Sequence, residues 1–246
     1  MTGLKDAVRA NFDASVSAYG AYERRTGRFG TLARLLLAEM RTAADRPTET
    51  LLDAGAGTGI STTVLAESGS RTVALDLSAG MLRSNGAAER VQGDFDRLPF
   101  GEDCFDGVAF TASLFLVSDP VVAVREARRV CRPGGVVGAV APLGWVDANG
   151  VDVFERLGRD SRSPAGPGAV EDALAREFDV ECGTWRFAAT AGDVARFQAI
   201  PAMAARLDPT AAPEERVRKA TDLLAGLEGT VEERWRWVVG VADEGT

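Results

Sequence analysis

The amino-acid sequence predicts an α/β fold in which a mostly parallel sheet carries helices on both faces. Segments typical of buried strands alternate with helical segments from residue 51 to residue 141. The first predicted strand leads into a loop with three alternating glycines, Gly55, Gly57 and Gly59. The first two predicted strands each end in an aspartate, Asp53 and Asp76. A glycine-rich turn from strand to helix lets a ligand approach the backbone and meet the N–H groups that begin the helix.

Length and composition are those of a soluble globular protein. The 246 residues can bury a sizeable core within one domain, and 46% of them are apolar and 26% charged. A net charge of −8 argues against a nucleic-acid partner. The sequence shows neither an apolar run long enough to cross a membrane nor a secretion signal, so we expect a cytoplasmic protein. We also expect it to be a monomer or a homodimer.

Two helices are predicted before the first strand. Residues 4–24 form an amphipathic pattern that we expect to break near Gly20, and residues 27–44 form a second one. A turn at residues 46–48 leads into the strand.

The glycine loop is followed by a predicted helix over residues 60–66. A dinucleotide-binding loop of the form G-x-G-x-x-G would need a third glycine at position 60, where the chain has Ile60. By itself the loop is also compatible with a purely structural turn.

The second strand, residues 71–76, ends in Asp76, which lies 17 residues past Gly59 (76 − 59). An acid about 20 residues beyond such a loop is well placed to accept hydrogen bonds from ribose hydroxyls. The alternative is a solvated strand end. Ser78 is the predicted N-cap of the next helix.

The remaining elements continue the alternation. Thr111–Leu116 would leave the carboxyl end of the fourth strand, where open α/β sheets bind ligands. The predicted elements are a short strand and turn at 91–95, strands at 104–110 and 136–141, a helix at 121–131 with a turn at 132–135, a turn-rich loop over the site at 161–168, helices at 169–177, 190–200 and 213–227, and strands at 179–188 and 234–242.

Four motifs in this order resemble those of the class I S-adenosylmethionine (SAM)-dependent methyltransferases. They are D-x-G-x-G-x-G at 53–59, V-A-L-D-L-S-x-x-M-L at 73–82, G-D-x-x-x-L-P-F at 93–100, and F-D-x-V at 105–108 followed by R-P-G-G at 132–135. The resemblance implies a Rossmann-like, seven-stranded, mostly parallel sheet with an antiparallel last strand. It also implies one domain, with a helical lid at 1–45, a SAM-binding core at 46–143 and a substrate-side portion at 144–246.

The same resemblance implies which residues hold SAM. The glycine loop would pass under the methionine part, and Asp76 would bind the ribose. Asp94 would accept from the adenine amino group, while the backbone N–H of Phe95 contacts the ring. The implied cofactor-binding residues are Asp53, Ala54, Gly55, Gly57, Gly59, Asp76, Leu77, Met81, Gly93, Asp94, Phe95, Thr111 and Tyr19.

Phe12-Asp13, with Tyr19 and Tyr22 behind it, partly resembles the F-D-x-x-A-x-x-Y opening of ubiquinone/menaquinone-type and malonyl-carrier-type methyltransferases. That segment closes over the cofactor in those families, so we expect residues 1–24 to act as a lid. The match is partial, because Gly20 stands where an aspartate often follows the tyrosine. The other interpretation is that Phe12 and Tyr19 anchor a helix.

The resemblance implies methyl transfer from SAM to a small-molecule acceptor, with S-adenosylhomocysteine as product. No catalytic residue is identified. The chain has no histidine, which favours carboxylate, thiolate or activated-carbon acceptors over unactivated alcohols. Two alternatives stay open. One is a carboxyl methyltransferase acting on an acyl-carrier-bound substrate, suggested by the N-terminal resemblance and by arginines at 125, 128, 129 and 132, which a solvated helix face explains equally well. The other is a non-catalytic SAM- or dinucleotide-binding protein.

Cys104, Cys131 and Cys182 are far apart in the sequence, and with no histidine a Cys/His zinc site is excluded. We expect no metal, and we interpret all three cysteines as buried small apolar residues.

Overall fold

The computed structural model describes residues 2–153, 167–205 and 212–244. By its contacts the chain separates into two compact units, each described here by itself. Unit 1 comprises residues 1–27, 143–163 and 185–235, and unit 2 comprises residues 28–142, 164–184 and 236–246. The single domain expected from the sequence stays a prediction.

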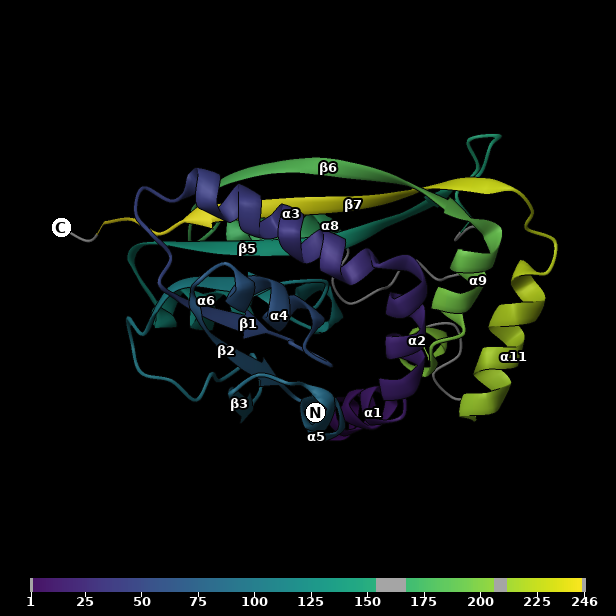
Figure 1. Ribbon diagram of the computed structural model, residues 1–246, viewed down its shortest axis with the longest axis horizontal. Helices are drawn as coiled ribbons and strands as arrows, with labels where there is room; N and C mark the ends of the chain where they lie inside the picture. Colours follow the sequence, from purple (N-terminus) through teal and green to yellow (C-terminus); the bar gives the residue numbers. More distant parts are fainter. Residues whose placement is uncertain (1, 154–166, 206–211, 245–246) are drawn as a thin grey trace. The chain divides into compact units, whose positions relative to one another are not determined.

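In the described part of the chain, seven strands form one sheet in the order β3-β2-β1-β4-β5-β7-β6 (Figure 1). The sheet is mostly parallel and its last strands are antiparallel, which confirms the predicted fold class. The strands are β1 (Thr50–Ala54), β2 (Arg71–Asp76), β3 (Glu89–Gln92), β4 (Phe105–Phe110), β5 (Cys131–Val146), β6 (Asp179–Thr190) and β7 (Thr230–Val241).

The register of the parallel strands brings their carboxyl ends to one edge. Ala54, the last residue of β1, lies opposite Leu75, and Asp53 lies opposite Ala109 in β4. The loops that follow β1, β2 and β4 therefore leave the sheet side by side. This is the edge at which open α/β sheets bind their ligands.

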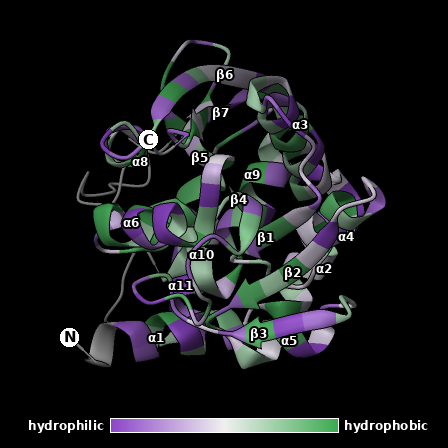
Figure 2. Ribbon diagram, turned by 90° about the vertical axis from the view of Figure 1, so that its left-hand side faces the viewer, coloured by the Kyte–Doolittle hydropathy of each residue, from purple (hydrophilic) through white to green (hydrophobic). Residues whose placement is uncertain are grey.

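Helices cover both faces of the sheet in unit 2. Figure 2 shows α3 (Arg28–Ala43) and α4 (Ile60–Glu67) on one side of strands β1 and β4, and α6 (Pro120–Val130) and α8 (Pro167–Leu174) on the other. Helix α3 packs closely on β5. A Cβ added at Gly138 would lie 2.8 Å from the Met40 side chain, so glycine at this position allows the close approach. Two short helical elements, α5 (Ala79–Ser84) and the 3₁₀ turn η1 (Leu114–Leu116), follow β2 and β4.

The turn expected at residues 132–135 is an irregularity inside β5. Cys131 lies opposite Phe105, whereas Val136 already lies opposite Gly107, so the partner strand advances two residues while β5 advances five. Gly134 takes up part of this excess with a φ of 68°. The predicted turn is therefore a bulge within a longer strand, which continues on both sides of residues 132–135.

The cysteines only partly follow the expectation. Cys131 is buried, Cys104 is partly exposed and Cys182 is exposed. Burial raises the pKa of the Cys131 thiol to about 12. Cys182 lies in β6, the last strand in the sheet order, where a side chain has fewer neighbours.

Unit 1 is built largely from helices: α1 (Thr2–Asp13), α2 (Val16–Thr26), α9 (Ala191–Gln198), α10 (Pro201–Ala204) and α11 (Pro213–Leu224). The first helical segment breaks at Ser15, and the predicted break at Gly20 is wrong. Ser15 is fully buried, and its hydroxyl donates to Asn11 O and accepts from the N–H of Ala202. This contact with α10 stabilises the break, whereas Gly20 sits within α2.

Strand β5 continues past the predicted strand end at residue 141 to Val146, which forms an antiparallel bridge with Asp152. Of the turn-rich loop predicted at 161–168, residues 161–166 lie outside the described residues, and residues 167 and 168 begin α8. None of the helices that the structure describes is both long enough and apolar enough to cross a membrane.

Candidate functional site

The glycine loop after β1 adopts a backbone that suits glycine at three positions. Gly55, Gly57 and Gly59 have φ values of 83°, 52° and 94°, a region that other residues rarely adopt. Gly55 also has no room for a side chain, since a Cβ there would lie 2.3 Å from the Cβ of Ser113. The loop therefore presents bare backbone at the carboxyl edge of the sheet.

Asp53 is buried beneath this loop. Its side chain is fully inaccessible, and Oδ2 accepts from the hydroxyls of Ser61 at 2.7 Å and Thr62 at 2.6 Å, both in α4. Oδ1 has no hydrogen-bond partner among the described residues. Burial raises the pKa of Asp53 to about 6, because desolvation outweighs the two hydroxyl bonds. Asp53 thus ties β1 to the first turn of α4.

Asp76 joins the glycine loop to the end of β2. Its Oδ2 accepts from the N–H of Gly57 at 2.9 Å, and its Oδ1 accepts from the N–H of Ser78 at 2.7 Å. The carboxylate is partly exposed. Each carboxylate oxygen can accept more than one hydrogen bond, so the group is fixed in place and can still accept further hydrogen bonds.

The chain after β3 runs alongside the same loop. The N–H of Gly93 donates to Asp76 O at 3.0 Å. Asp94 follows, with its Oδ1 accepting from the N–H of Asp96 at 3.1 Å. The ring of Phe95 lies against Phe110 at a centroid distance of 5.4 Å. Phe95 also borders Gly55, since a Cβ on that glycine would lie 3.2 Å from its Cζ.

Three further predicted residues belong to the same unit. Met81 is buried in α5, and Leu77 is partly exposed just after β2. Thr111 follows β4 directly and is 8% exposed, yet its hydroxyl has no hydrogen-bond partner among the described residues. A buried hydroxyl without a partner is unusual and marks a place where a ligand can supply one.

Two side chains of α6, Glu126 and Arg129, hold the loop at residues 98–100 by hydrogen bonds to its backbone. The sequence analysis did not predict these contacts. Glu126 accepts from the N–H of Leu98 at 2.8 Å, and Arg129 donates to Leu98 O and Phe100 O at 3.1 and 2.8 Å. Arg129 also pairs with Glu126 at 2.6 Å. The i, i+3 spacing of Glu126 and Arg129 on a predicted helix is enough to predict their ion pair. It does not predict that the pair binds the loop at residues 98–100.

Tyr19 lies in unit 1, on α2, and its ring stacks on Phe12 with centroids 6.0 Å apart. The Tyr22 ring is buried against Phe197 in the same unit, at 5.3 Å. These contacts are those of a helix anchor. The role of Tyr19 at the cofactor, and the lid, stay predictions.

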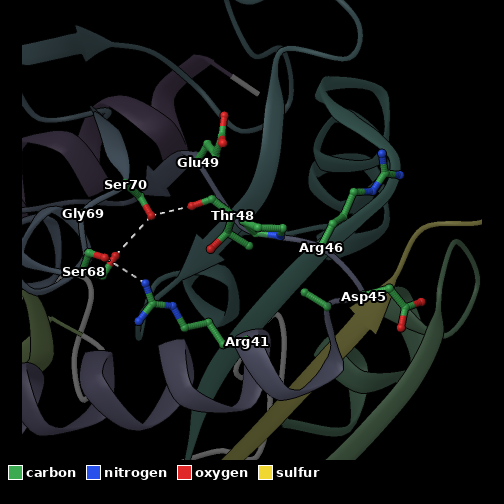
Figure 3. A pocket seen from close by; sticks show the side chains of 10 residues that line it. Arg41, Asp45, Arg46, Thr48, Glu49, Ser68, Gly69 and Ser70 are labelled. Carbon is green, nitrogen blue, oxygen red and sulfur yellow. Dashed lines mark hydrogen bonds between the residues drawn. The ribbon is translucent and has the colours of Figure 1, made fainter.

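A surface hollow of about 480 Å³ lies at the other end of the sheet, before β1 and β2 begin. Figure 3 shows that its polar groups bond with one another: Arg41 donates to Ser68 O at 2.9 Å, and the Ser70 hydroxyl donates to Thr48 O. Because the hollow lies at the amino ends of β1 and β2, it is separate from the glycine loop at their carboxyl ends. The described residues contain no cluster of three or more His, Cys, Asp or Glu side chains able to hold a metal.

The strand order, the glycine loop and the acids ending β1 and β2 together define a class I methyltransferase fold. Residues 52–138 match the model of a family described as methyltransferase domain. Residues 52–138 thus match a methyltransferase domain, and this match confirms the resemblance predicted from the motifs.

Curated relatives are named demethylmenaquinone methyltransferase. The one from Mycobacterium tuberculosis (strain ATCC 25618 / H37Rv) is 37% identical over 137 residues, or 55% of each chain. The one from Mycolicibacterium paratuberculosis is 49% identical over 92 residues, which cover 36% of this chain and 40% of that protein. The chain thus matches these relatives over about half of their length or less.

Solved structures share the fold at low identity. A candidate methyltransferase from Bacillus halodurans C-125 has a TM-score of 0.59 at 19% identity, covering 86% of this chain and 99% of that one. The [4+2]-cyclase SpnF has a TM-score of 0.56 at 17% identity, covering 88% and 82%. Since one of these proteins is a cyclase, the fold alone does not define the reaction.

Proposed function

We propose that this protein transfers a methyl group from SAM to a small-molecule acceptor. The observation that carries the proposal is the Asp76 carboxylate, which is held between the N–H groups of Gly57 and Ser78 at the carboxyl edge of the sheet. An acid fixed at this place suits the two hydroxyls of a ribose. The family match over residues 52–138 supports the same conclusion.

The residues present fit SAM. Gly55 and Gly57 offer backbone without side chains, as a methionine moiety lying on the loop requires. The Thr111 hydroxyl, buried without a partner among the described residues, can bond to a polar group of the ligand. The cofactor-binding set given in the sequence analysis is our proposal for this site. The side chain of Asp53 is inaccessible to a ligand. Asp53 would therefore support the site indirectly, by fixing the start of α4 through Ser61 and Thr62.

Bound SAM would supply an electrophilic methyl group on a sulfonium. The protein's own contribution would be to hold the acceptor in line at about 3–3.5 Å and to exclude water. A base is needed only if the acceptor must lose a proton. With no histidine in the chain and Asp53 buried beneath the loop, acceptors that already carry a nucleophilic atom are favoured.

Two observations favour a small molecule over an acyl-carrier-bound substrate. The curated relatives act, by their names, on demethylmenaquinone, which is a small molecule. In addition, three arginines of the suggested carrier surface are paired within the chain: Arg125 with Glu177, Arg129 with Glu126, and Arg132 with Asp106. Arginines held in internal pairs are less available to an acidic carrier.

Titration calorimetry and a transfer assay test the proposal. We expect SAM and S-adenosylhomocysteine to bind and NAD not to bind. Label from methyl-labelled SAM should then pass to at least one member of a panel of hydroquinones, small carboxylic acids and thiols. Binding of NAD instead of SAM would contradict the proposal. Binding of SAM with no transfer to any acceptor, an acyl-carrier substrate included, would favour a non-catalytic role.

A further inference from the structure

Asn85 lies directly beneath the glycine loop, although no motif includes it. It follows α5 as the C-cap residue and is 1% exposed. Gly59 leaves the space that Asn85 occupies, since a Cβ on that glycine would lie 2.7 Å from Asn85 Oδ1 and 2.8 Å from its Cγ. The loop and this amide thus fit against each other.

The side chain of Asn85 uses both ends of its amide. Nδ2 donates to Thr62 Oγ1 at 3.2 Å and, over a longer 3.4 Å, to Gly57 O. Oδ1 accepts from the N–H of Ala87 at 2.9 Å. The backbone N–H can only donate, so the oxygen must face Ala87 and the nitrogen must face the loop. Arg90 fixes the backbone of Asn85 by donating to its O at 2.7 Å.

These bonds place Asn85 between the two acids of the site. On one side the hydroxyl of Thr62 donates a hydrogen bond to Asp53 Oδ2 at 2.6 Å. On the other side Gly57, whose carbonyl receives the amide, donates its N–H to Asp76 Oδ2 at 2.9 Å. Gly57 is therefore held at both its N–H and its carbonyl, and Asn85 supplies the bond to the carbonyl.

We propose that Asn85 is a positioning residue that holds the glycine loop in the conformation that receives SAM. The inference rests on the proposed function, because it needs a cofactor on the loop. A loop with three glycines loses much conformational freedom when it is ordered. A bond that orders it before binding lowers the cost of binding. Asn85 is buried behind the loop backbone, so its effect on a ligand would act through the loop.

The test compares Asn85→Ala with wild type by calorimetry, with SAM and S-adenosylhomocysteine as probes. We expect both dissociation constants to rise about tenfold, the effect of losing a buried hydrogen bond. Hydrogen exchange of the amides at 55–59 in the ligand-free protein should become faster. Thr62→Val, which removes the hydroxyl that receives the Asn85 amide, should act in the same direction, and Thr62→Ser should restore affinity.

Val130→Ala is the matched control. Val130 is fully buried at the end of α6, just before Cys131, which pairs with the first residue of β4 at the edge of the sheet opposite the loop. It should lower the melting temperature while leaving the dissociation constants unchanged. If Asn85→Ala does not fold, Asn85→Ser carries the same test, because a serine hydroxyl can still accept from the N–H two residues on but is too short to reach Gly57 O or Thr62 Oγ1.

Three outcomes overturn the inference. Wild-type affinity in Asn85→Ala, or in Asn85→Ser if the alanine variant does not fold, would do so while leaving the proposed function intact. So would weaker binding in Val130→Ala that matches the loss of stability, because Asn85 would then be a structural residue only. A wild-type protein that binds neither SAM nor S-adenosylhomocysteine would overturn the proposed function together with this inference.

Discussion

The N–H of Gly57 donates to Oδ2 of Asp76 at 2.9 Å, so the loop after β1 and the acid at the end of β2 are one hydrogen-bonded unit. The two residues lie 19 apart in the sequence (76 − 57). The same carboxylate holds Ser78 through Oδ1 at 2.7 Å. Asp76 therefore shapes the loop as well as being the acceptor that we propose for a ribose.

Replacing Asp76 should affect binding more than folding. Asp76→Ala removes the acceptor for the ribose hydroxyls, worth about 1.5–3 kcal/mol for charge-assisted bonds. We expect the dissociation constant of SAM, measured by calorimetry, to rise tenfold or more. The melting temperature should fall modestly, since two backbone N–H groups lose their acceptor. Asp222→Asn, an exposed carboxyl on α11, is the control, and unchanged SAM affinity in Asp76→Ala would rule out the ribose role.

Gly55→Ala should destabilise the protein strongly. The residue has a φ of 83° and its new Cβ would lie 2.3 Å from Ser113 Cβ, so backbone strain of about 1–3 kcal/mol adds to a steric clash. Urea unfolding measures the loss. Gly226→Ala, where nothing lies within 4 Å of the added carbon, should change stability little. Equal effects in the two variants would contradict the close approach of Ser113.

Asp53 should make the protein less stable as pH rises from about 4 to 6. Burial raises the pKa of this carboxyl from 3.8 to about 6, so the folded state binds a proton that the unfolded state has released. The contribution of Asp53 is therefore fully present below pH 4 and lost above pH 6. The difference of about 2 pKa units corresponds to ~3 kcal/mol.

Urea unfolding of wild type and Asp53→Asn at pH 4.5, 5.5 and 7 measures this effect. The substituted amide does not titrate, so the stability of the variant relative to wild type should improve steadily from pH 4.5 to 7. A pH-independent difference would mean that Asp53 keeps an ordinary pKa in the folded protein.

The lid prediction for residues 1–24 is testable by limited proteolysis. Arg9 and Arg24 are exposed and offer trypsin sites. If the segment closes over the cofactor, cleavage there should slow at least severalfold with saturating S-adenosylhomocysteine, while cleavage at exposed Arg218 in α11 stays constant. Equal cleavage rates with and without ligand would leave the segment as the helix anchor that Ser15 and Tyr22 suggest.

The parts of the molecule that follow from local patterns were predictable from the sequence. The order of strands and helices, the glycine loop and the strand-end acids are all encoded in short stretches. The break at Ser15 was not predictable, because it depends on a bond to Ala202, which lies 187 residues away in the chain. A glycine seemed the better breaker on propensity alone, and the tertiary contact overrode that preference.

The same reason explains what was missed at the site. Asn85 binds Thr62 and Gly57 across 23 and 28 residues, and an asparagine after a short helix predicts only a cap. The burial of Asp53 likewise depends on how α4 packs on β1. The residue types of the loop were visible in the sequence, but the bonds that hold the loop required the fold.

The buried thiol at the start of β5 gives this protein an internal reporter of unfolding. Alkylating reagents react with thiolates, and with a pKa of about 12 and no exposed surface Cys131 is protected while the sheet is intact. Cys182 is exposed and will be modified first. In a pulse-labelling experiment read by mass spectrometry, modification of Cys182 marks every molecule, whereas modification of Cys131 marks those in which the β4–β5 pair has opened. The fraction of unfolded molecules can thus be measured in the wild-type sequence, without an added fluorescent dye or tag.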